Sequence, residues 1–80
     1  MSNISKNTTQ ANLAAIAIIG DRDPKKDTVD ILMTMEQSVT AILLMATGDP
    51  RMAAMMLNDA LVPAVEGRLS FFASKLGGKQ

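Results

Sequence analysis

The side chains that most often carry out chemistry in proteins are largely missing from this sequence. Its 80 residues include no His, Cys, Trp or Tyr, while 48% are hydrophobic and seven are Met. Without His or Cys, an ordinary structural zinc site is excluded, and without Cys so is a disulfide. We therefore expect no enzyme activity, no metal and no cofactor, and we expect the function to be binding.

The methionines have the clearest chemical potential of the residues that remain. Thioether sulfur is a soft ligand that suits Cu(I), and Met33 with Met35, or Met52 with Met55, has a spacing that a copper site could use. Flexible Met side chains also suit an adaptable protein-binding surface or the filling of a core. Because no His or Cys would assist a copper site, core packing and a partner surface are the favoured interpretations.

The carboxylates lack the spacing of a calcium-binding or catalytic site. The loop 21–27 begins like a calcium loop, but an EF-hand needs Gly and Glu where this sequence has Lys26 and Leu32. Glu36 and Glu66 are the only glutamates, and no second acid or His stands at a spacing that would assist acid–base catalysis. We predict a solvated loop between helices, an ion pair of Glu66 with a basic neighbour, and a place for Glu36 at the edge of a helix–helix contact.

Charge and hydropathy narrow the class of partner. Eight basic and eight acidic residues balance, and no basic run exceeds Lys25-Lys26, so we expect no nucleic-acid binding. The apolar run 12–20 follows a weakly basic start and makes a poor secretory signal. The longest charge-free apolar stretch, residues 37–48, is shorter than the ~20 residues of a membrane span. We expect a cytoplasmic protein that does not bind membranes.

A first helix is predicted in the N-terminal part of the chain. Residues 1–7 are polar and are assigned to a disordered tail. Thr8 or Thr9 can then cap a helix that ends at Gly20, the residue type best suited to a left-handed helix end. A buried strand over residues 15–19 is the alternative, which the alanines disfavour. The helix is apolar almost all round, so it must be buried in its own subunit or in a contact between subunits.

A second helix is predicted over residues 28–47. Pro24 interrupts the polar loop before it, Asp27 is a suitable N-cap, and Gly48 marks its end. Its apolar positions recur every three to four residues, as an amphipathic helix requires. They are Val29, Leu32, Met35 or Glu36, Val39, Ile42 or Leu43, and Ala46.

The C-terminal half predicts one or two further helices. Asp49 caps a third helix with Pro50 in its first turn, and Pro63 either kinks this helix or begins a fourth. Gly67 interrupts the pattern and can mark a close backbone crossing, while residues 77–80 form a tail. A series of apolar residues at helix–helix spacing follows Pro63, and we call it the seam: Val62, Val65, Leu69, Phe72 and Leu76.

These elements predict an all-α fold, a bundle of three or four helices in a single domain over residues 8–76. The short joint at residues 48–50 predicts a central antiparallel hairpin of the second and third helices. So small a chain without disulfides or metal usually needs another subunit to complete its core, so we also predict a homodimer.

The function predicted from the sequence is that of a small non-enzymatic regulator or adaptor that binds a partner protein through its helices. Phe71 cannot face the seam together with Phe72, because adjacent helical residues point about 100° apart. A structural helical subunit that assembles only with its own copies is the alternative. The residues predicted to bind the partner are Met52, Met55, Met56, Phe71 and Leu76.

Overall fold

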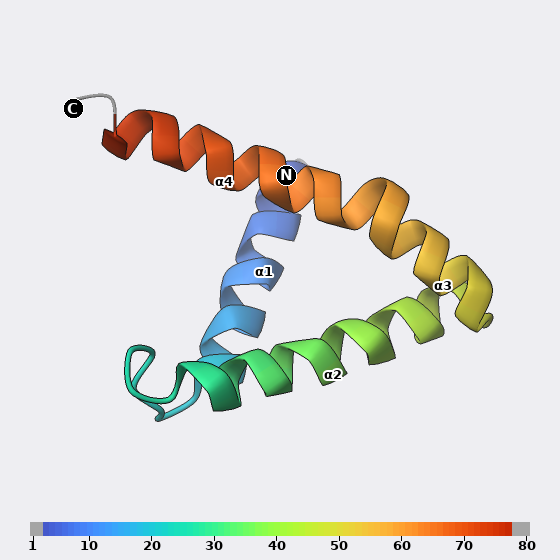
Figure 1. Ribbon diagram of the computed structural model, residues 1–80, viewed down its shortest axis with the longest axis horizontal. Helices are drawn as coiled ribbons and strands as arrows, with labels where there is room; N and C mark the ends of the chain where they lie inside the picture. Colours follow the sequence, from blue (N-terminus) through green and yellow to red (C-terminus); the bar gives the residue numbers. More distant parts are fainter. Residues whose placement is uncertain (1–2, 78–80) are drawn as a thin grey trace. The chain divides into compact units, whose positions relative to one another are not determined.

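The computed structural model describes residues 3–77, and this part of the chain is helical without strands, which confirms the all-α class (Figure 1). The contacts divide the chain into two units, Met1–Val39 and Thr40–Gln80, and each is described by itself. The bundle, its antiparallel hairpin and the dimer stay predictions. The elements are α1 (Asn3–Ile19), α2 (Thr28–Thr47), α3 (Pro50–Met56), the π-helical segment η1 (Leu57–Leu61) and α4 (Val62–Gly77).

The predicted helix ends at the two left-handed glycines are confirmed. Gly20 follows α1 with a φ of 61°, and Gly48 follows α2 with a φ of 71°. Asp49 caps α3, its side chain accepting a hydrogen bond from the backbone N–H of Arg51, and Pro50 occupies the first helical position. The alternative of a strand over residues 15–19 is wrong, since α1 includes them.

The start of α1 differs from the prediction. The helix begins at Asn3, so residues 3–7 are helical where we predicted a tail, and Thr8 and Thr9 lie inside the helix instead of capping it. The hydroxyl of Thr9 donates to the carbonyl of Ser5 one turn earlier, a bond that satisfies a threonine within a helix. Residues 1, 2 and 78–80 of the two predicted tails lie outside the described residues, and Gly77 ends α4.

The loop between α1 and α2 is organised by its own carboxylates. Asp23 accepts hydrogen bonds from the backbone N–H groups of Lys25 and Lys26 at 2.9 and 3.3 Å. Asp27 stands at the start of α2, where its carbonyl accepts from the N–H of Ile31. Its carboxylate, however, accepts from the N–H of Asp23 at 3.0 Å and does not cap α2 as predicted. Two of the acids that suggested a calcium loop therefore hold the turn closed.

Within the first unit, Arg22 connects the end of α1 to α2. Its guanidinium donates to the carbonyls of Ile18 and Ile19 and to the hydroxyl of Thr34, which lies 3.0 Å from Nη1. One turn before Thr34, Ile31 is the buried residue of α2, with 6% of its surface exposed. Ile31 and Thr34 therefore lie on the side of α2 that is turned away from solvent in this unit.

Several positions of the apolar pattern predicted for α2 therefore face solvent, Met35 among them. Val29 and Leu32 belonged to that pattern, yet both are exposed in the structure. The sequence pattern considered apolar residues only, whereas the partly buried hydrogen bond from Arg22 is made on the side of α2 that carries a hydroxyl.

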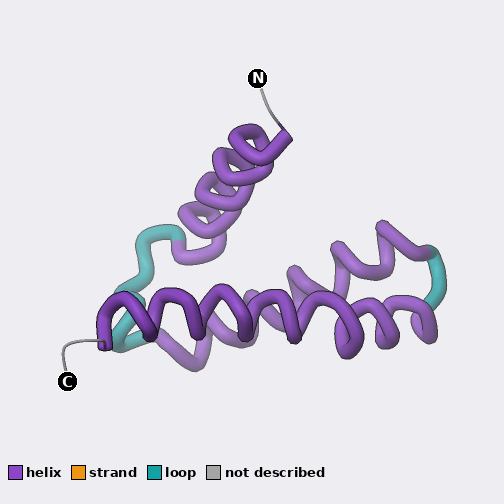
Figure 2. Tube along the Cα trace, turned by 90° about the horizontal axis from the view of Figure 1, so that it is seen from above, coloured by secondary structure: helices purple, strands orange, loops and turns teal. Residues whose placement is uncertain are grey.

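In the second unit, α3, η1 and α4 form one unbroken helical run (Figure 2). Proline in a helix lacks an N–H and its ring collides with the carbonyl four residues earlier. Pro63 is the second residue after η1, and the N–H of Val62 before it bonds to the carbonyl of Leu57, five residues back instead of four. This wider turn adds one residue and leaves room for the ring. Pro63 thus stands in the first turn of α4, which continues from η1 without a break.

Candidate protein-binding surface

The five residues predicted to bind a partner all lie on the helical run of the second unit. Each is exposed, from Met56 at 46% of its surface to Leu76 at 80%. Within the second unit by itself, the three methionines therefore do not fill a core. Met52, Met55 and Met56 belong to α3, and Phe71 and Leu76 belong to α4.

Helical phase sorts these five residues onto two opposite faces. Met52 and Phe71 are nineteen residues apart. The π-helical turn η1 contains one residue more than an α-helical turn. The rotation between the two side chains is therefore that of about eighteen α-helical residues, which is five full turns. Phe71 therefore lies on the side of the run that carries the three methionines. We call this side the Met–Phe face, and it consists of Met52, Met55, Met56 and Phe71.

Leu76 lies on the other side, together with the seam. Leu57 and Leu76 are also nineteen residues apart, so the same count places Leu57 in line with the seam. Leu57 follows Met52 by five residues, so its side chain points about 140° away from that of Met52 around the helix axis. The structure thus brings four of the five predicted residues onto one face and leaves Leu76 on the other.

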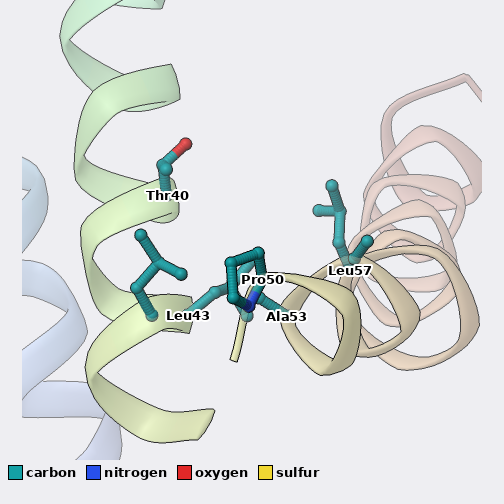
Figure 3. A pocket seen from close by; sticks show the side chains of 7 residues that line it. Thr40, Leu43, Pro50, Ala53 and Leu57 are labelled. Atoms are coloured by element: carbon teal, nitrogen blue, oxygen red, sulfur yellow. The ribbon is translucent and has the colours of Figure 1, made fainter. Parts of the chain in front are cut away.

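The α3 end of the seam side borders an apolar pocket. Ala53 is 7% exposed, and Pro50 and Leu57 lie next to it on the wall formed by the helical run. Thr40 and Leu43 of α2 form the facing wall (Figure 3). The pocket measures about 250 Å³. This is below the usual range for small-molecule sites, about 300–1,000 Å³, and is suited to one apolar side chain of a partner.

The two phenylalanines of α4 are both at the surface. Phe71 is 56% exposed and Phe72 58%, and their rings meet edge to face with centroids 5.7 Å apart. The ammonium of Lys75 lies 5.2 Å from the centroid of the Phe71 ring, a cation–π distance that steadies the ring. The two rings point about 100° apart around the helix, and they touch at the border between the Met–Phe face and the seam.

Gly67 lies beside these rings in a shallow hollow of α4 that it lines with Ala64, Arg68 and the two phenylalanines. A Cβ built on Gly67 meets nothing within 4 Å. The close backbone crossing predicted at this glycine is therefore not made by the second unit itself.

The described residues hold no cluster that would support metal chemistry of the usual kind. Within residues 3–77, no three Asp or Glu side chains come together in a way that could hold a metal ion.

One helix, α2, is long and apolar enough to cross a membrane by length and composition alone. The core helix of a soluble protein can have the same composition, so we keep membrane binding as a question for experiment.

The comparisons add no relative to this picture: no family model, no curated protein and no solved structure matches the chain. The functional interpretation therefore depends on the surface described above.

Sequence reasoning missed the alignment of the two faces. The Met pattern ends at Met56 and the seam begins at Val62, so their relative phase depends on how many residues the turn between them takes up. Pro63 was the available signal, because a proline inside a helical pattern often coincides with a change of helical pitch.

Proposed function

We propose that the protein is a small non-enzymatic regulator or adaptor that binds a partner protein along its Met–Phe face. The observation that carries this proposal is the alignment of Met52, Met55, Met56 and Phe71 on one exposed side of a continuous helical run. Met side chains adapt to irregular partners, and an aromatic anchor contributes a large share of the energy of a helix-on-helix contact.

The geometry favours an elongated partner over a compact one. Met55 and Phe71 are sixteen residues apart, which corresponds to about 24 Å along a helix at 1.5 Å per residue. One helix of similar length would contact both ends of the face. The gap contains Gly67, where the absence of a side chain permits close approach of a partner backbone.

The proposal is tested by capture of partners on the tagged full-length chain from its native lysate. We expect a foreign protein in stoichiometric amount, and we expect Phe71→Ser and Met55→Ser each to reduce its capture about tenfold or more. Phe72→Ser is the matched control, since it removes an equally exposed ring that points about 100° away around the helix. Equal loss with Phe72→Ser, or no loss with Phe71→Ser, would contradict the Met–Phe face as the binding surface.

A structural subunit that binds only its own copies is the second candidate. The number of large apolar side chains exposed on the described chain favours it, because soluble monomers rarely leave so many in contiguous patches. Recovery of nothing but its own copies, in a fixed number larger than two across a dilution series, would support this candidate against the regulator.

A further inference from the structure

Two positively charged side chains of α4 lie between the directions of its two phenylalanines. On a helix with about 100° per residue, Lys75 points about 40° from Phe71 toward Phe72. Arg68, three residues before Phe71, points about 60° from it toward the same side. Both basic residues are exposed. The border between the Met–Phe face and the seam therefore carries two positive charges within an otherwise apolar surface.

No carboxylate of α4 neutralises these two charges. Glu66 is the acid of this helix, and it points about 140° from Phe71 toward the side away from both basic residues. Residues two apart on a helix do not face each other, so Glu66 does not make its predicted ion pair with Arg68. Asp59 lies nine residues before Arg68, about 13 Å along the helical run, whereas an ion pair spans about 4 Å. This end of the Met–Phe face is thus locally basic.

The guanidinium of Arg68 also belongs to the shallow hollow beside Phe71. Arg68 is the charged residue of the hollow, whose other lining residues are Ala64, Gly67 and the two phenylalanines. Gly67 contributes no side chain there, so the backbone of a partner can come close to α4. A guanidinium holds a carboxylate through two parallel hydrogen bonds. The hollow therefore combines a group that binds carboxylates with an aromatic anchor.

The spacing of the two basic residues defines the spacing of the acids that would pair with them. Arg68 and Lys75 are seven residues apart, which is two helical turns or about 10.5 Å along the axis. Phe71 lies between them, with the ammonium of Lys75 5.2 Å from its ring centroid. That ammonium has three N–H donors, so it can contact the ring and also donate to a carboxylate. A helix with two acids seven residues apart would meet both charges and place an apolar residue against Phe71.

We propose that the segment of the partner protein that contacts Phe71 is an acidic helix, whose carboxylates about seven residues apart pair with Arg68 and Lys75. This inference rests on the proposed function, because it names the chemistry of the partner at one end of the Met–Phe face. The positions of the charges favour a protein over an anionic lipid surface. A helix that lies in a lipid surface keeps its cations on a polar face, whereas Arg68 and Lys75 have apolar residues on either side.

The experiment uses synthetic helical peptides as probes of the untagged full-length chain. The acidic peptide carries two Glu residues seven positions apart on a leucine-rich face, and two matched peptides carry Gln or Lys at these positions. Fluorescence anisotropy of the labelled peptides measures binding. We expect the dissociation constant of the acidic peptide to be about tenfold lower than that of the Gln peptide. We also expect this difference to shrink between about 50 and 500 mM NaCl, because salt screens exposed charges.

Exchange of the charges gives the sharpest comparison. The double variant Arg68→Glu, Lys75→Glu should reverse the preference, so that the Lys peptide binds about tenfold more tightly than the acidic peptide. Arg68→Lys keeps the charge but loses the two parallel hydrogen bonds, and it should weaken the acidic peptide about threefold. The matched control is Lys25→Glu, Lys26→Glu, which changes the net charge by the same amount in the loop of the first unit. Circular dichroism confirms that each variant keeps its helicity.

Four outcomes would overturn the inference. The first is equal affinity for the three peptides, or no binding of any of them at about 500 µM; the proposed function would survive this if Phe71→Ser still abolishes partner capture from the lysate. The second is binding of the acidic peptide that Phe71→Ser leaves unchanged, which would place the contact elsewhere.

The third outcome is a marked fall in the thermal midpoint of Arg68→Gln that Lys25→Gln does not show, because Arg68 would then pair with an acid of its own chain. The fourth is sedimentation of the wild type with vesicles of phosphatidylglycerol that the double variant of Arg68 and Lys75 abolishes. The two charges would then bind lipid headgroups and not a partner helix.

Discussion

Arg22 donates a hydrogen bond from Nη1 to the hydroxyl of Thr34, 3.0 Å away and twelve residues later in the chain. The same guanidinium donates to the carbonyls of Ile18 and Ile19, which α1 leaves without a helical partner at its end. Thr34 in turn donates to the carbonyl of Asp30. One side chain thus closes α1 and attaches the loop to α2.

Loss of this connection should destabilise the chain measurably. We expect Arg22→Ala to lower the free energy of unfolding by about 1–2 kcal/mol, because it removes bonds to carbonyls and to a hydroxyl that lie partly buried. Thr34→Val should cost less, since the bonds at the end of α1 remain. Urea denaturation followed by circular dichroism measures both. Lys25→Ala is the control for loss of an exposed charge, and an equal effect there would refute a specific role for Arg22.

The glycines 48 and 67 should respond to alanine with opposite signs. Gly48 has a φ of 71° with open space around it, so Gly48→Ala should cost roughly 1–2 kcal/mol from backbone strain alone. Gly67 lies within α4, where Gly67→Ala should add about 1 kcal/mol through helix propensity. Thermal denaturation of both variants checks the signs. If Gly67→Ala gains helicity but captures less partner, a helix of the partner protein must cross the backbone of α4 closely at Gly67.

The cap of α3 gives a third prediction. Asp49→Ala removes the acceptor of the Arg51 N–H and should lower the free energy of unfolding by about 1 kcal/mol. Asp49→Asn should cost much less, because an amide oxygen still accepts the bond. Equal losses for the two variants would mean that the charge of Asp49, and not its capping oxygen, is what stabilises the helix.

Membrane binding by α2 can be tested directly. We expect the protein to remain in the supernatant when it is sedimented with vesicles of phosphatidylglycerol and phosphatidylcholine. Asp30 lies in the first turn of α2 and Glu36 nearer its middle, and an aspartate in the centre of a membrane helix costs about 2.5–3.5 kcal/mol. The double variant Asp30→Asn, Glu36→Gln is the sensitive comparison. Sedimentation of the wild type with the vesicles, and stronger sedimentation of the double variant, would favour a membrane role for α2.

Most helix ends could be predicted because their causes are local. Gly20 and Gly48 adopt the left-handed conformation, and Asp49 with Pro50 starts α3, whatever lies around them. The start of α1 could not be placed in the same way. Thr9 was predicted as a cap, but a threonine hydroxyl can also bond back to the preceding turn, and here it does so to Ser5.

The candidate surface was predicted residue by residue, but its division into faces was not. The exposure of Met55 or Phe71 does not depend on the turn at η1, whereas their shared face does. An apolar pattern alone cannot say whether Pro63 kinks the helix, ends it or is preceded by a wider turn. Leu76 was therefore grouped with Phe71, although about 140° of helical rotation separates them.

The sequence by itself determined the all-α class and the left-handed helix ends, because each follows from residue type and near neighbours. The tertiary structure decided the rest: that Arg22 bonds to Thr34, that Ile31 and not Leu32 is buried, and that one π turn aligns Leu57 with Leu76. These outcomes depend on groups many residues apart competing for the same space and the same hydrogen bonds, and no short window of sequence contains both competitors.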